Sequence, residues 1–273
     1  MSIPLEDNIS DIIGKAQRGL GISDSQLAEK AGVAVEKVRQ LRDGKFDDGA
    51  IERVAPVLQL SAAALRELAA GNWQPEPIGE IEGLAQFNTT YHDMTVNAYL
   101  VWDPFAREAV AFDTGADCGG MLQRIEQEKV RVKLILLTHA HPDHVADLRR
   151  LKKATDAPIY ISRQEEAEGA EEVEEGRRFR VGSLEIEARL TSGHSPGGMT
   201  FVVTGLSRPV AIVGDSLFAG SMGGGNISYA DALRNNRDKI LTLPDDTIVC
   251  PGHGPLTTVG KEKRDNPFFA EHR

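Results

Sequence analysis

The sequence feature that most constrains the fold is an apolar run that ends in a cluster of potential metal ligands. Residues 134–137 (Leu-Ile-Leu-Leu) predict a buried strand. Directly after it come His139, His141, Asp143 and His144. His139 and His141 are two residues apart, so in an extended chain their side chains point to the same side. Four nitrogen and oxygen donors in so small a volume are typical of a divalent-metal site.

A helix is predicted directly after the strand. Pro142 suits its first turn, and Val145, Leu148 and Leu151 would share its buried face. The alternative interpretation makes Asp143 the N-cap of this helix and the histidines ordinary polar loop residues. That alternative is adequate for any one of these residues, but the four together favour a metal site.

Three further residues of ligand type follow predicted strands later in the chain, each beside a glycine or proline: His194, Asp215 and His253. Taken singly, Asp215 could cap a turn and His194 could be a polar loop residue. However, loops at the ends of strands in one sheet lie close together, and sites are commonly built there. We therefore expect these three side chains to converge with the first four.

The rest of residues 80–273 predicts an α/β fold. Further strands are predicted at 95–102, 108–113, 157–161, 184–190, 199–204, 209–215 and 247–250, and further helices at 119–129 and 229–241. Residues 165–175 hold seven glutamates in eleven positions. Such a charge run is typical of a solvated helix or loop, and we expect no catalytic role for it.

The first 73 residues carry only helical signals. Short helices are predicted at 24–31, 34–43, 50–58 and 61–70, and Ser23 and Gly32 are suited to cap the first of these. Residues 74–79 contain two prolines and little apolar content, as in a linker. The predicted organisation is a helical domain over 1–73, a linker over 74–79 and a second domain over 80–273.

The segment 26–33, followed by Val38, Leu41 and Gly44, resembles the phage-repressor-like helix-turn-helix family. The resemblance implies that one helix would enter a DNA major groove, with four residues facing the bases or phosphates: Lys37, Arg39, Gln40 and Arg42. The charge argues against DNA binding, because residues 1–73 carry nine Lys and Arg against eleven Asp and Glu, a net of −2. Asp24 also stands where that family commonly places a DNA-contacting glutamine. The alternative is a docking or dimerisation domain, through which the chain would form an oligomer.

The histidine and aspartate pattern closely resembles the metallo-β-lactamase superfamily, with His-x-His-x-Asp-His followed by a separate His, an Asp and a final His. The resemblance covers residues 80–273 and implies an αββα sandwich with a dinuclear site at one sheet edge. It implies that His139, His141 and His194 hold the first metal ion. Asp143, His144 and His253 would hold the second ion, and Asp215 would bridge the two. Asp143 is also the candidate proton acceptor.

Within that superfamily, residues 214–220, 243–247, 251–255 and 266–268 resemble the glyoxalase II (hydroxyacylglutathione hydrolase) branch. The resemblance implies a metal-bridging hydroxide that acts on a thioester or related small acyl substrate. Asp215 occupies a position where true β-lactamases typically carry cysteine. Two differences bear on the substrate: only 20 residues follow His253, and the loop 221–225 lacks the basic residue with which that family grips the glutathione carboxylate. The sequence therefore identifies no substrate-binding residue.

Two divalent ions are the expected cofactors. Zinc is the expected metal, and ligands without thiolate also suit iron or manganese. One alternative is a persulfide dioxygenase-like enzyme with a single iron on His139, His194 and Asp215. Another is a DNA-binding regulator whose metallo-β-lactamase-like domain senses a metabolite.

The net charge of −10 argues against broad binding to nucleic acid or anionic membranes. The N-terminus shows no basic segment followed by an apolar stretch, and no apolar run reaches the roughly 18 residues of a membrane span. Two cysteines, Cys118 and Cys250, cannot form a disulfide framework and suit a reducing compartment. We therefore expect a cytoplasmic enzyme with a small-molecule substrate and no membrane partner.

Overall fold

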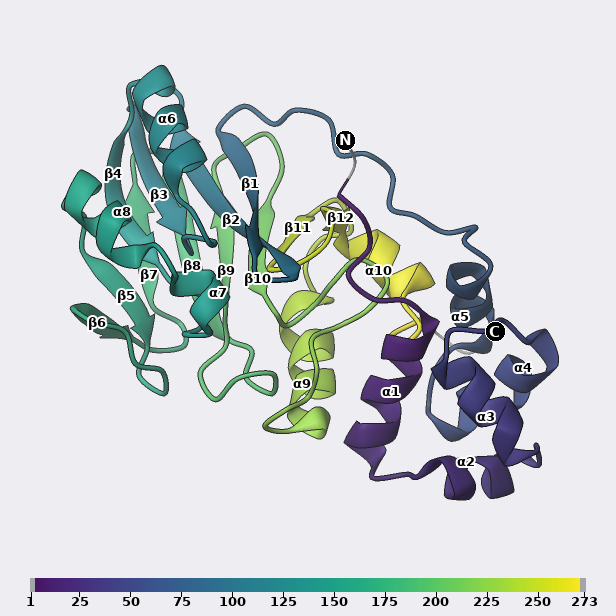
Figure 1. Cartoon of the computed structure of the whole chain (residues 1–273). Coiled ribbons are helices and arrows are strands. Elements are labelled where there is room, and N and C mark those ends of the chain that lie inside the picture. The colour runs from purple at the N-terminus through teal and green to yellow at the C-terminus, as the bar shows by residue number, and fades with distance from the viewer. Residues whose placement is uncertain (1–2, 271–273) are drawn as a thin grey trace.

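The computed structural model describes residues 3–270, which comprise a group of short helices followed by two packed sheets (Figure 1). The N-terminal helices are α1 Ile9–Leu20, α2 Asp24–Ala31, α3 Val35–Arg42, α4 Asp48–Val57 and α5 Ala62–Ala69. The Ser23 hydroxyl accepts a hydrogen bond from the Gln26 nitrogen, and the Gln26 side chain accepts one from the Ser23 nitrogen, so α2 begins as predicted. Gly32 ends it in the left-handed conformation (φ 63°). Helix α1 had not been predicted as a separate element.

The first sheet has the strand order β1-β2-β3-β4-β5-β6. Its strands are β1 Leu84–Tyr91, β2 Met94–Asp103, β3 Glu108–Phe112, β4 Arg131–Leu136, β5 Ile159–Ser162 and β6 Ala170–Val173. The first three strands are antiparallel, whereas β3, β4, β5 and β6 run parallel to one another. The loop that carries the predicted ligand His139 therefore leaves the sheet from a central parallel strand, β4.

The second sheet has the order β12-β11-β10-β9-β8-β7. Its strands are β7 Arg178–Val181, β8 Leu184–Leu190, β9 Met199–Thr204, β10 Val210–Gly214, β11 Ile248–Pro251 and β12 Thr257–Thr258. Strands β10 and β11 are parallel, and the other neighbours are antiparallel. Asp215 and His253 therefore leave the sheet on the same side, because parallel strands end at the same edge.

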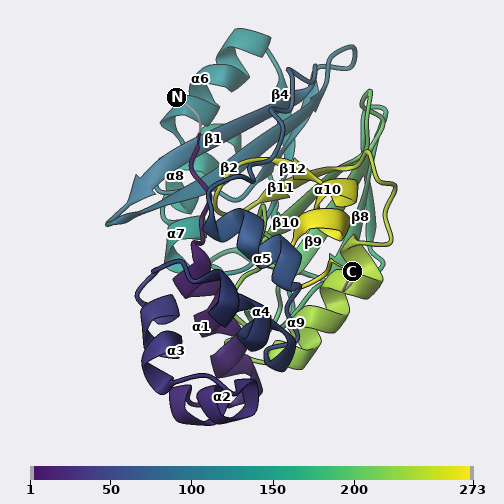
Figure 2. The same ribbon diagram turned by 90° about the vertical axis from the view of Figure 1, so that its right-hand side faces the viewer.

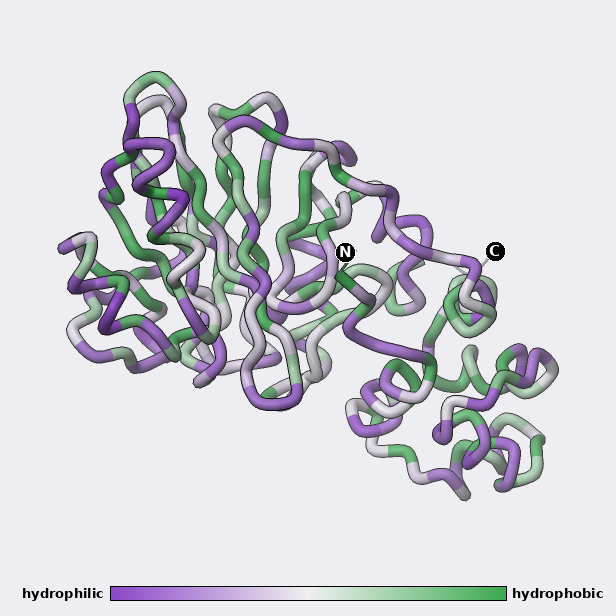
Figure 3. The backbone as a smooth tube through the Cα atoms, turned by 45° about the horizontal axis from the view of Figure 1, so that its top comes forward, coloured by the Kyte–Doolittle hydropathy of each residue, from purple (hydrophilic) through white to green (hydrophobic). Residues whose placement is uncertain are grey.

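Apolar side chains fill the space between the two sheets, where the rings of Phe112 and Phe201 lie 5.7 Å apart. The outer face of the first sheet packs on α6 Gly119–Glu128 and α8 Leu148–Thr155. The outer face of the second sheet packs on residues 240–243 and on α10 Val259–Asp265. Figure 3 shows the apolar residues along the strands and polar residues on the covering helices. The prediction of a two-sheet α/β sandwich is confirmed.

The helical segment, helices α1–α5, packs on the same side of the molecule as the second sheet. It lies beside α9 Tyr229–Asn235 (Figure 2). Its apolar core includes Met222, Tyr229 and Phe268. Contact is close, because a Cβ atom at Gly19 would lie 2.1 Å from the Tyr229 ring. Trp73, at the end of the predicted helical domain, is buried against Gly220. The domain limits remain a prediction, and apolar packing is continuous across them.

Two predicted helices are each divided in the structure. The helix expected after Pro142 forms a single turn, α7 Pro142–Val145, before α8 begins. Asp147 separates the two pieces, because its nitrogen bonds Thr114 Oγ1 (3.2 Å) and its carboxylate accepts from the Cys118 nitrogen (2.9 Å). The helix expected over 229–241 is α9 followed by one π-helical turn, Asn236–Ile240. Strand β6 lies inside the glutamate run, where a helix or loop was predicted.

None of the helices within residues 3–270 combines the length and the apolar character needed to cross a bilayer.

Candidate metal centre

The structure brings all seven predicted ligands together where β4, β8, β10 and β11 end. They form two groups, within each of which the ligand atoms lie within 4.8 Å of one another. The first group comprises His139, His141, His194 and Asp215, and the second comprises Asp143, His144 and His253. The six other residues divide as in the two predicted sets, and Asp215, predicted to bridge them, falls in the first group. The assignment of these residues as metal ligands remains a prediction.

In the first group, three imidazole nitrogens converge. His139 Nε2 and His194 Nε2 each lie 3.0 Å from His141 Nδ1. Asp215 Oδ2 lies 3.3 Å from His194 Nε2 and 4.0 Å from His139 Nε2. His141 and His194 are partly exposed, so this side of the centre is open to solvent.

In the second group, the Asp143 carboxylate faces two imidazoles. Its Oδ2 atom lies 3.3 Å from His253 Nε2 and 3.5 Å from His144 Nε2. Asp215 reaches this group as well, since Oδ1 lies 3.3 Å from His144 Nε2 and Oδ2 lies 3.4 Å from His253 Nε2. Asp215 therefore lies between the two groups, where a bridging ligand would have to be.

The donor set fits divalent cations. His144 Nε2 and Asp215 Oδ1 are buried and have no hydrogen-bond partner in residues 3–270, although buried polar atoms are normally paired. A Cβ atom at Gly252 would lie 2.1 Å from Asp215 Oδ1, so only glycine allows the backbone this close to the carboxylate. Imidazole and carboxylate donors without thiolate suit zinc, iron or manganese.

The second nitrogen of four imidazoles is held by an oxygen atom. His139 Nδ1 bonds Thr138 Oγ1 (3.0 Å), and His144 Nδ1 bonds Asp113 Oδ2 (2.8 Å). The two others bond backbone carbonyls: His194 Nδ1 with Gly224 O (3.1 Å) and His253 Nδ1 with Thr95 O (2.6 Å). An acceptor on Nδ1 keeps a proton there, so Nε2 is the atom through which each ring would bind a cation, after losing any proton of its own.

Asp113 was not predicted as a site residue, although its carboxylate supports both groups. Oδ1 accepts from the Thr138 nitrogen (2.8 Å), while Oδ2 accepts from Thr138 Oγ1 (2.7 Å) and pairs with His144. Thr138 in turn contacts His139. Asp113 also has a positive φ of 54°, a conformation that Asp and Asn adopt more readily than other residues with a side chain. Its one visible signal in the sequence was its position at a strand end.

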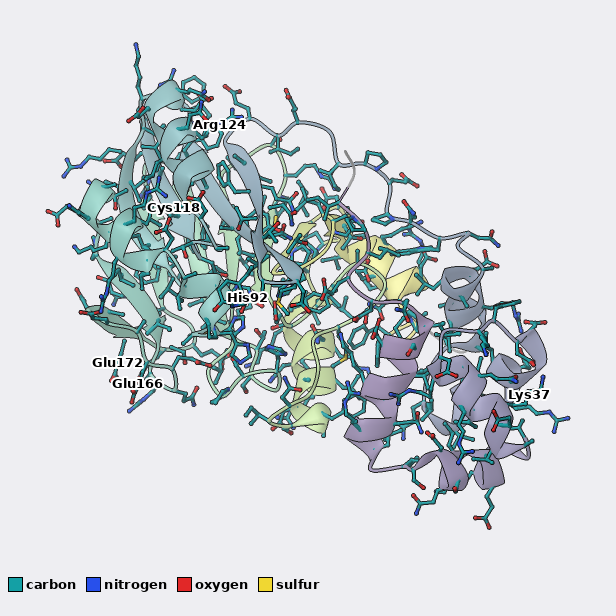
Figure 4. The ribbon with its side chains drawn as sticks, in the orientation of Figure 1. Lys37, His92, Cys118, Arg124, Glu166 and Glu172 are labelled. Atoms are coloured by element: carbon teal, nitrogen blue, oxygen red, sulfur yellow. The ribbon has the colours of Figure 1, made fainter. Side chains whose placement is uncertain are left out.

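Glu165 lies in the glutamate run for which no role was expected. Its carboxylate accepts from the Ala140 nitrogen (3.3 Å) and from the Gly197 nitrogen (2.9 Å). Ala140 lies between His139 and His141, and Gly197 follows His194, so Glu165 ties together the two loops that carry the first group. Two other glutamates of the run, Glu166 and Glu172, are labelled in Figure 4 and lie at the outer edge of the sheet.

Electrostatics divide the histidines into two kinds. Burial lowers the pKa of His139 well below its ordinary value, and burial also lowers that of His194, so both imidazoles are neutral. Burial opposes charge on His144 and His253 too, but Asp215 and the other carboxylates outweigh it and raise their pKa values to about 10 and about 11. Those histidines together hold the pKa of Asp215 well below its ordinary range. The carboxylates therefore favour positive charge at the centre, and bound cations would supply it.

The four residues predicted to face DNA lie on α3, away from the metal centre. Figure 4 shows Lys37 at the outer side of the helical segment, where it pairs with Asp47. Arg39 lies 3.5 Å from the Glu36 carboxylate, and Arg42 donates to Gln17 Oε1 (3.0 Å) inside the segment. Gln40 lies on the same helix. Three of the four side chains are therefore already engaged by neighbours within the segment.

Comparison with known proteins identifies the family. The model of the metallo-beta-lactamase superfamily matches residues 93–253, which include all seven predicted ligands. The chain is 32% identical over 198 residues to hydroxyacylglutathione hydrolase GloC of Haemophilus influenzae, covering 63% of this chain and 92% of that protein. The solved structure of the B3 metallo-beta-lactamase BLEG-1 superposes with a TM-score of 0.60 at 28% identity, covering 69% of this chain and all of that chain. TTHA1623, solved in a di-iron-bound form, gives a TM-score of 0.55 at 30% identity over 67% and 99% of the two chains.

The chain belongs to the metallo-beta-lactamase superfamily, whose fold binds divalent metals. The family match begins at residue 93, so it does not extend to helices α1–α5. The helix-turn-helix assignment for that segment stays a prediction.

Proposed function

We propose that this protein is a hydrolase with two divalent ions that cleaves a thioester or a related small acyl substrate. The observation that carries the proposal is the pair of donor groups that share Asp215, whose two oxygens approach ligands of both groups. Two ions held there would acidify a shared water molecule and polarise the carbonyl of the substrate. The di-iron form of TTHA1623 supports two ions in a related chain of this fold.

The residues of this chain orient the site and handle the proton. Thr138, Asp113, Gly224 and Thr95 fix the imidazole rings through their Nδ1 atoms. Burial opposes ionisation of Asp143, but the hydrogen bond from His253 outweighs it and lowers the pKa of Asp143 below its ordinary value. Asp143 is therefore an ionised carboxylate at neutral pH, the form that can bind a cation or accept a proton, although its lowered pKa makes it a weaker base than an ordinary aspartate.

The thioester is the favoured substrate class because a related chain is named a hydroxyacylglutathione hydrolase. The proposal does not extend to glutathione itself, because loop 221–225 offers no basic side chain of its own to bind a carboxylate. A site for the thiol portion of the substrate is therefore not assigned.

The test is hydrolysis of a panel of thioesters, lactones and phosphoesters by metal-replete protein, together with the metal content per chain. Two ions per chain and release of a thiol from at least one thioester are expected. A single iron per chain together with oxygen consumption would refute the proposal. It would support the dioxygenase-like alternative, in which His139, His194 and Asp215 hold the iron. Turnover of the lactones or phosphoesters alone would exclude the thioester assignment.

We further propose that the helical segment is a docking scaffold with a helix-turn-helix-like order of helices, and not a DNA reader. The support is the pairing of Lys37, Arg39 and Arg42 within the segment and its net charge of −2. A fluorescence anisotropy titration with labelled duplex DNA in low salt tests this. Saturable binding that weakens with salt and is lost in Lys37→Ala would restore the DNA-binding alternative.

A further inference from the structure

The loop after Asp215 lies directly on the ligands of the first group. The Gly224 carbonyl accepts from His194 Nδ1 (3.1 Å) and so fixes the orientation of that ring. A Cβ atom at Gly223 would lie 1.8 Å from the Asp215 carbonyl oxygen and 3.1 Å from His194 Nδ1. The backbone of this loop is therefore a wall of the metal centre, and glycine is required for so close an approach.

Three consecutive glycines, residues 223–225, cannot hold that position by themselves. Glycine has more backbone freedom than any other residue, so fixing three in a row is costly in conformational entropy. The position of the loop must therefore be set by contacts on its flanks. On the C-terminal side, Gly225 packs against Tyr229 at the start of α9.

On the N-terminal side, Asn266 Nδ2 donates to the Ser221 carbonyl oxygen (2.8 Å), and the charged contacts come from the helical segment. Lys15 on α1 donates from Nζ to the Met222 carbonyl oxygen (2.8 Å). Asp7 accepts from Lys15 and from the Ser221 hydroxyl. The side chains of Lys15 and Asp7 are only 12% and 6% exposed. Met222 itself is fully buried in the apolar core of the helical segment.

The same N-terminal segment also meets the second group of ligands. A Cβ atom at Gly254 would lie 3.3 Å from the Glu6 nitrogen and 3.7 Å from the Pro4 carbonyl oxygen. Glu6 Oε2 lies 4.0 Å from His253 Nδ1. Residues 4–7 and Lys15 thus contact the loops that follow β10 and β11, one for each metal group.

We propose that the helical segment is a built-in part of the metal centre, with Asp7 and Lys15 as positioning residues. They hold the glycine loop 221–225 against Asp215 and His194, and through it they fix the geometry of the first metal group. This inference does not depend on the identity of the substrate.

A direct role for Lys15 in binding an anionic substrate fits the contacts less well. Its ammonium group is neutralised by Asp7 and also donates to a carbonyl, so two of its three protons are in use. A third contact lies over the ring of Phe218, 5.0 Å from the centroid. This arrangement suits a fixed structural cation.

The test uses the full chain with the double substitution Asp7→Asn and Lys15→Met, which removes both charges of the buried pair together. The matched control is Asp48→Asn with Arg66→Met, an exposed ion pair in the same helical segment. Each protein is loaded with cobalt(II), and two properties are measured: the visible absorption spectrum and the rate at which a chelator removes the metal. The thermal melting of each metal-free protein shows that it is folded.

The double variant is expected to lose cobalt about tenfold faster than wild type, since loss of groups that orient ligands typically weakens metal binding 10–100-fold. Its absorption spectrum should also change, because His194 is no longer fixed. The control should match wild type in both respects. A double variant with the spectrum and loss rate of the control would overturn the proposal.

A milder variant covers the case in which the double variant fails to fold. Ser221→Ala removes only the hydroxyl bond to Asp7. It is expected to speed cobalt loss by a smaller factor and to shift the spectrum in the same direction as the double variant. A folded Ser221→Ala protein indistinguishable from wild type would also contradict the proposal.

Discussion

Replacing Asp113 by Asn would change a single atom next to both metal groups. Asp113 is 2% exposed, and its Oδ2 atom faces the Thr138 hydroxyl (2.7 Å) and His144 Nδ1 (2.8 Å). Asn has the same shape and tolerates the positive φ at this position, so the fold is expected to be retained. The amide oxygen of the variant side chain can still accept from the Thr138 nitrogen. The amide nitrogen would then take the place of Oδ2. It is a hydrogen-bond donor, whereas Oδ2 accepts hydrogen bonds at this position.

The cost follows from the hydrogen bonds that the amide cannot make. His144 would have to move its proton from Nδ1 to Nε2, the atom that faces Asp143 and Asp215. A protonated Nε2 cannot bind a cation. Leaving a buried donor unpaired costs about 1–3 kcal/mol, which agrees with the 10–100-fold loss, or roughly 1.4–2.7 kcal/mol, typical of groups that orient a metal ligand.

The assay is a competition titration of each metal-loaded protein against a chromophoric chelator, which separates the two ions by affinity. Asp103→Asn is the matched control, since Asp103 is a buried aspartate that accepts from the nitrogens of Phe105, Ala106 and Ser183. Those bonds hold the pKa of Asp103 at about 2. The control should lose stability and keep both ions at wild-type affinity.

For Asp113→Asn we expect the ion at Asp143, His144 and His253 to be weakened by about 10–100-fold, and the other ion to be affected less. Wild-type affinity at both positions would refute the assignment of Asp113 as the group that fixes His144. An equal loss in Asp103→Asn would refute it too, because the effect would then reflect general destabilisation.

Three further outcomes are expected. Glu165→Gln should reduce turnover and speed metal loss, while Glu166→Gln, an exposed neighbour, should match wild type. His194→Ala and Asp143→Asn should each reduce turnover by orders of magnitude with an unchanged circular dichroism spectrum; a near-normal rate in either would disprove the site. Burial raises the pKa of Glu262 from 4.5 to about 7, so its stabilising effect is present below about pH 4.5 and lost as pH rises through 7. The free energy of unfolding in denaturant should therefore fall more between pH 5 and 8 in wild type than in Glu262→Gln.

The convergence of the seven candidate ligands could be predicted because their signals are local. His139, His194, Asp215 and His253 each follow an apolar strand, and the residue types themselves indicate metal chemistry. Asp113 also ends a strand, but its role arises from the parallel pairing of β3 with β4, which places it beside Thr138. That register is a long-range property that no single segment reveals.

The same distinction explains Glu165 and the divided helices. Glu165 looks like its six glutamate neighbours, and only the approach of the loops at Ala140 and Gly197 distinguishes it. The break at Asp147 depends on Thr114 and Cys118, which lie about thirty residues away in the sequence. Helical periodicity continues across the break, so the pattern alone predicts one helix.

The contacts of the helical segment bear on the function that its sequence resemblance implies. The sequence resemblance predicts a DNA-binding module, yet Lys37, Arg39 and Arg42, the cations predicted to face DNA, are engaged within the segment. Lys15, a buried cation on α1, instead donates to the loop that follows Asp215. A DNA reader needs unpaired cations on the recognition helix, whereas a positioning unit needs fixed charges at the contact with the enzyme. The helical segment has such fixed charges at its contact with the enzyme. Substitutions on α1 should therefore disturb metal retention, and those on α3 should not.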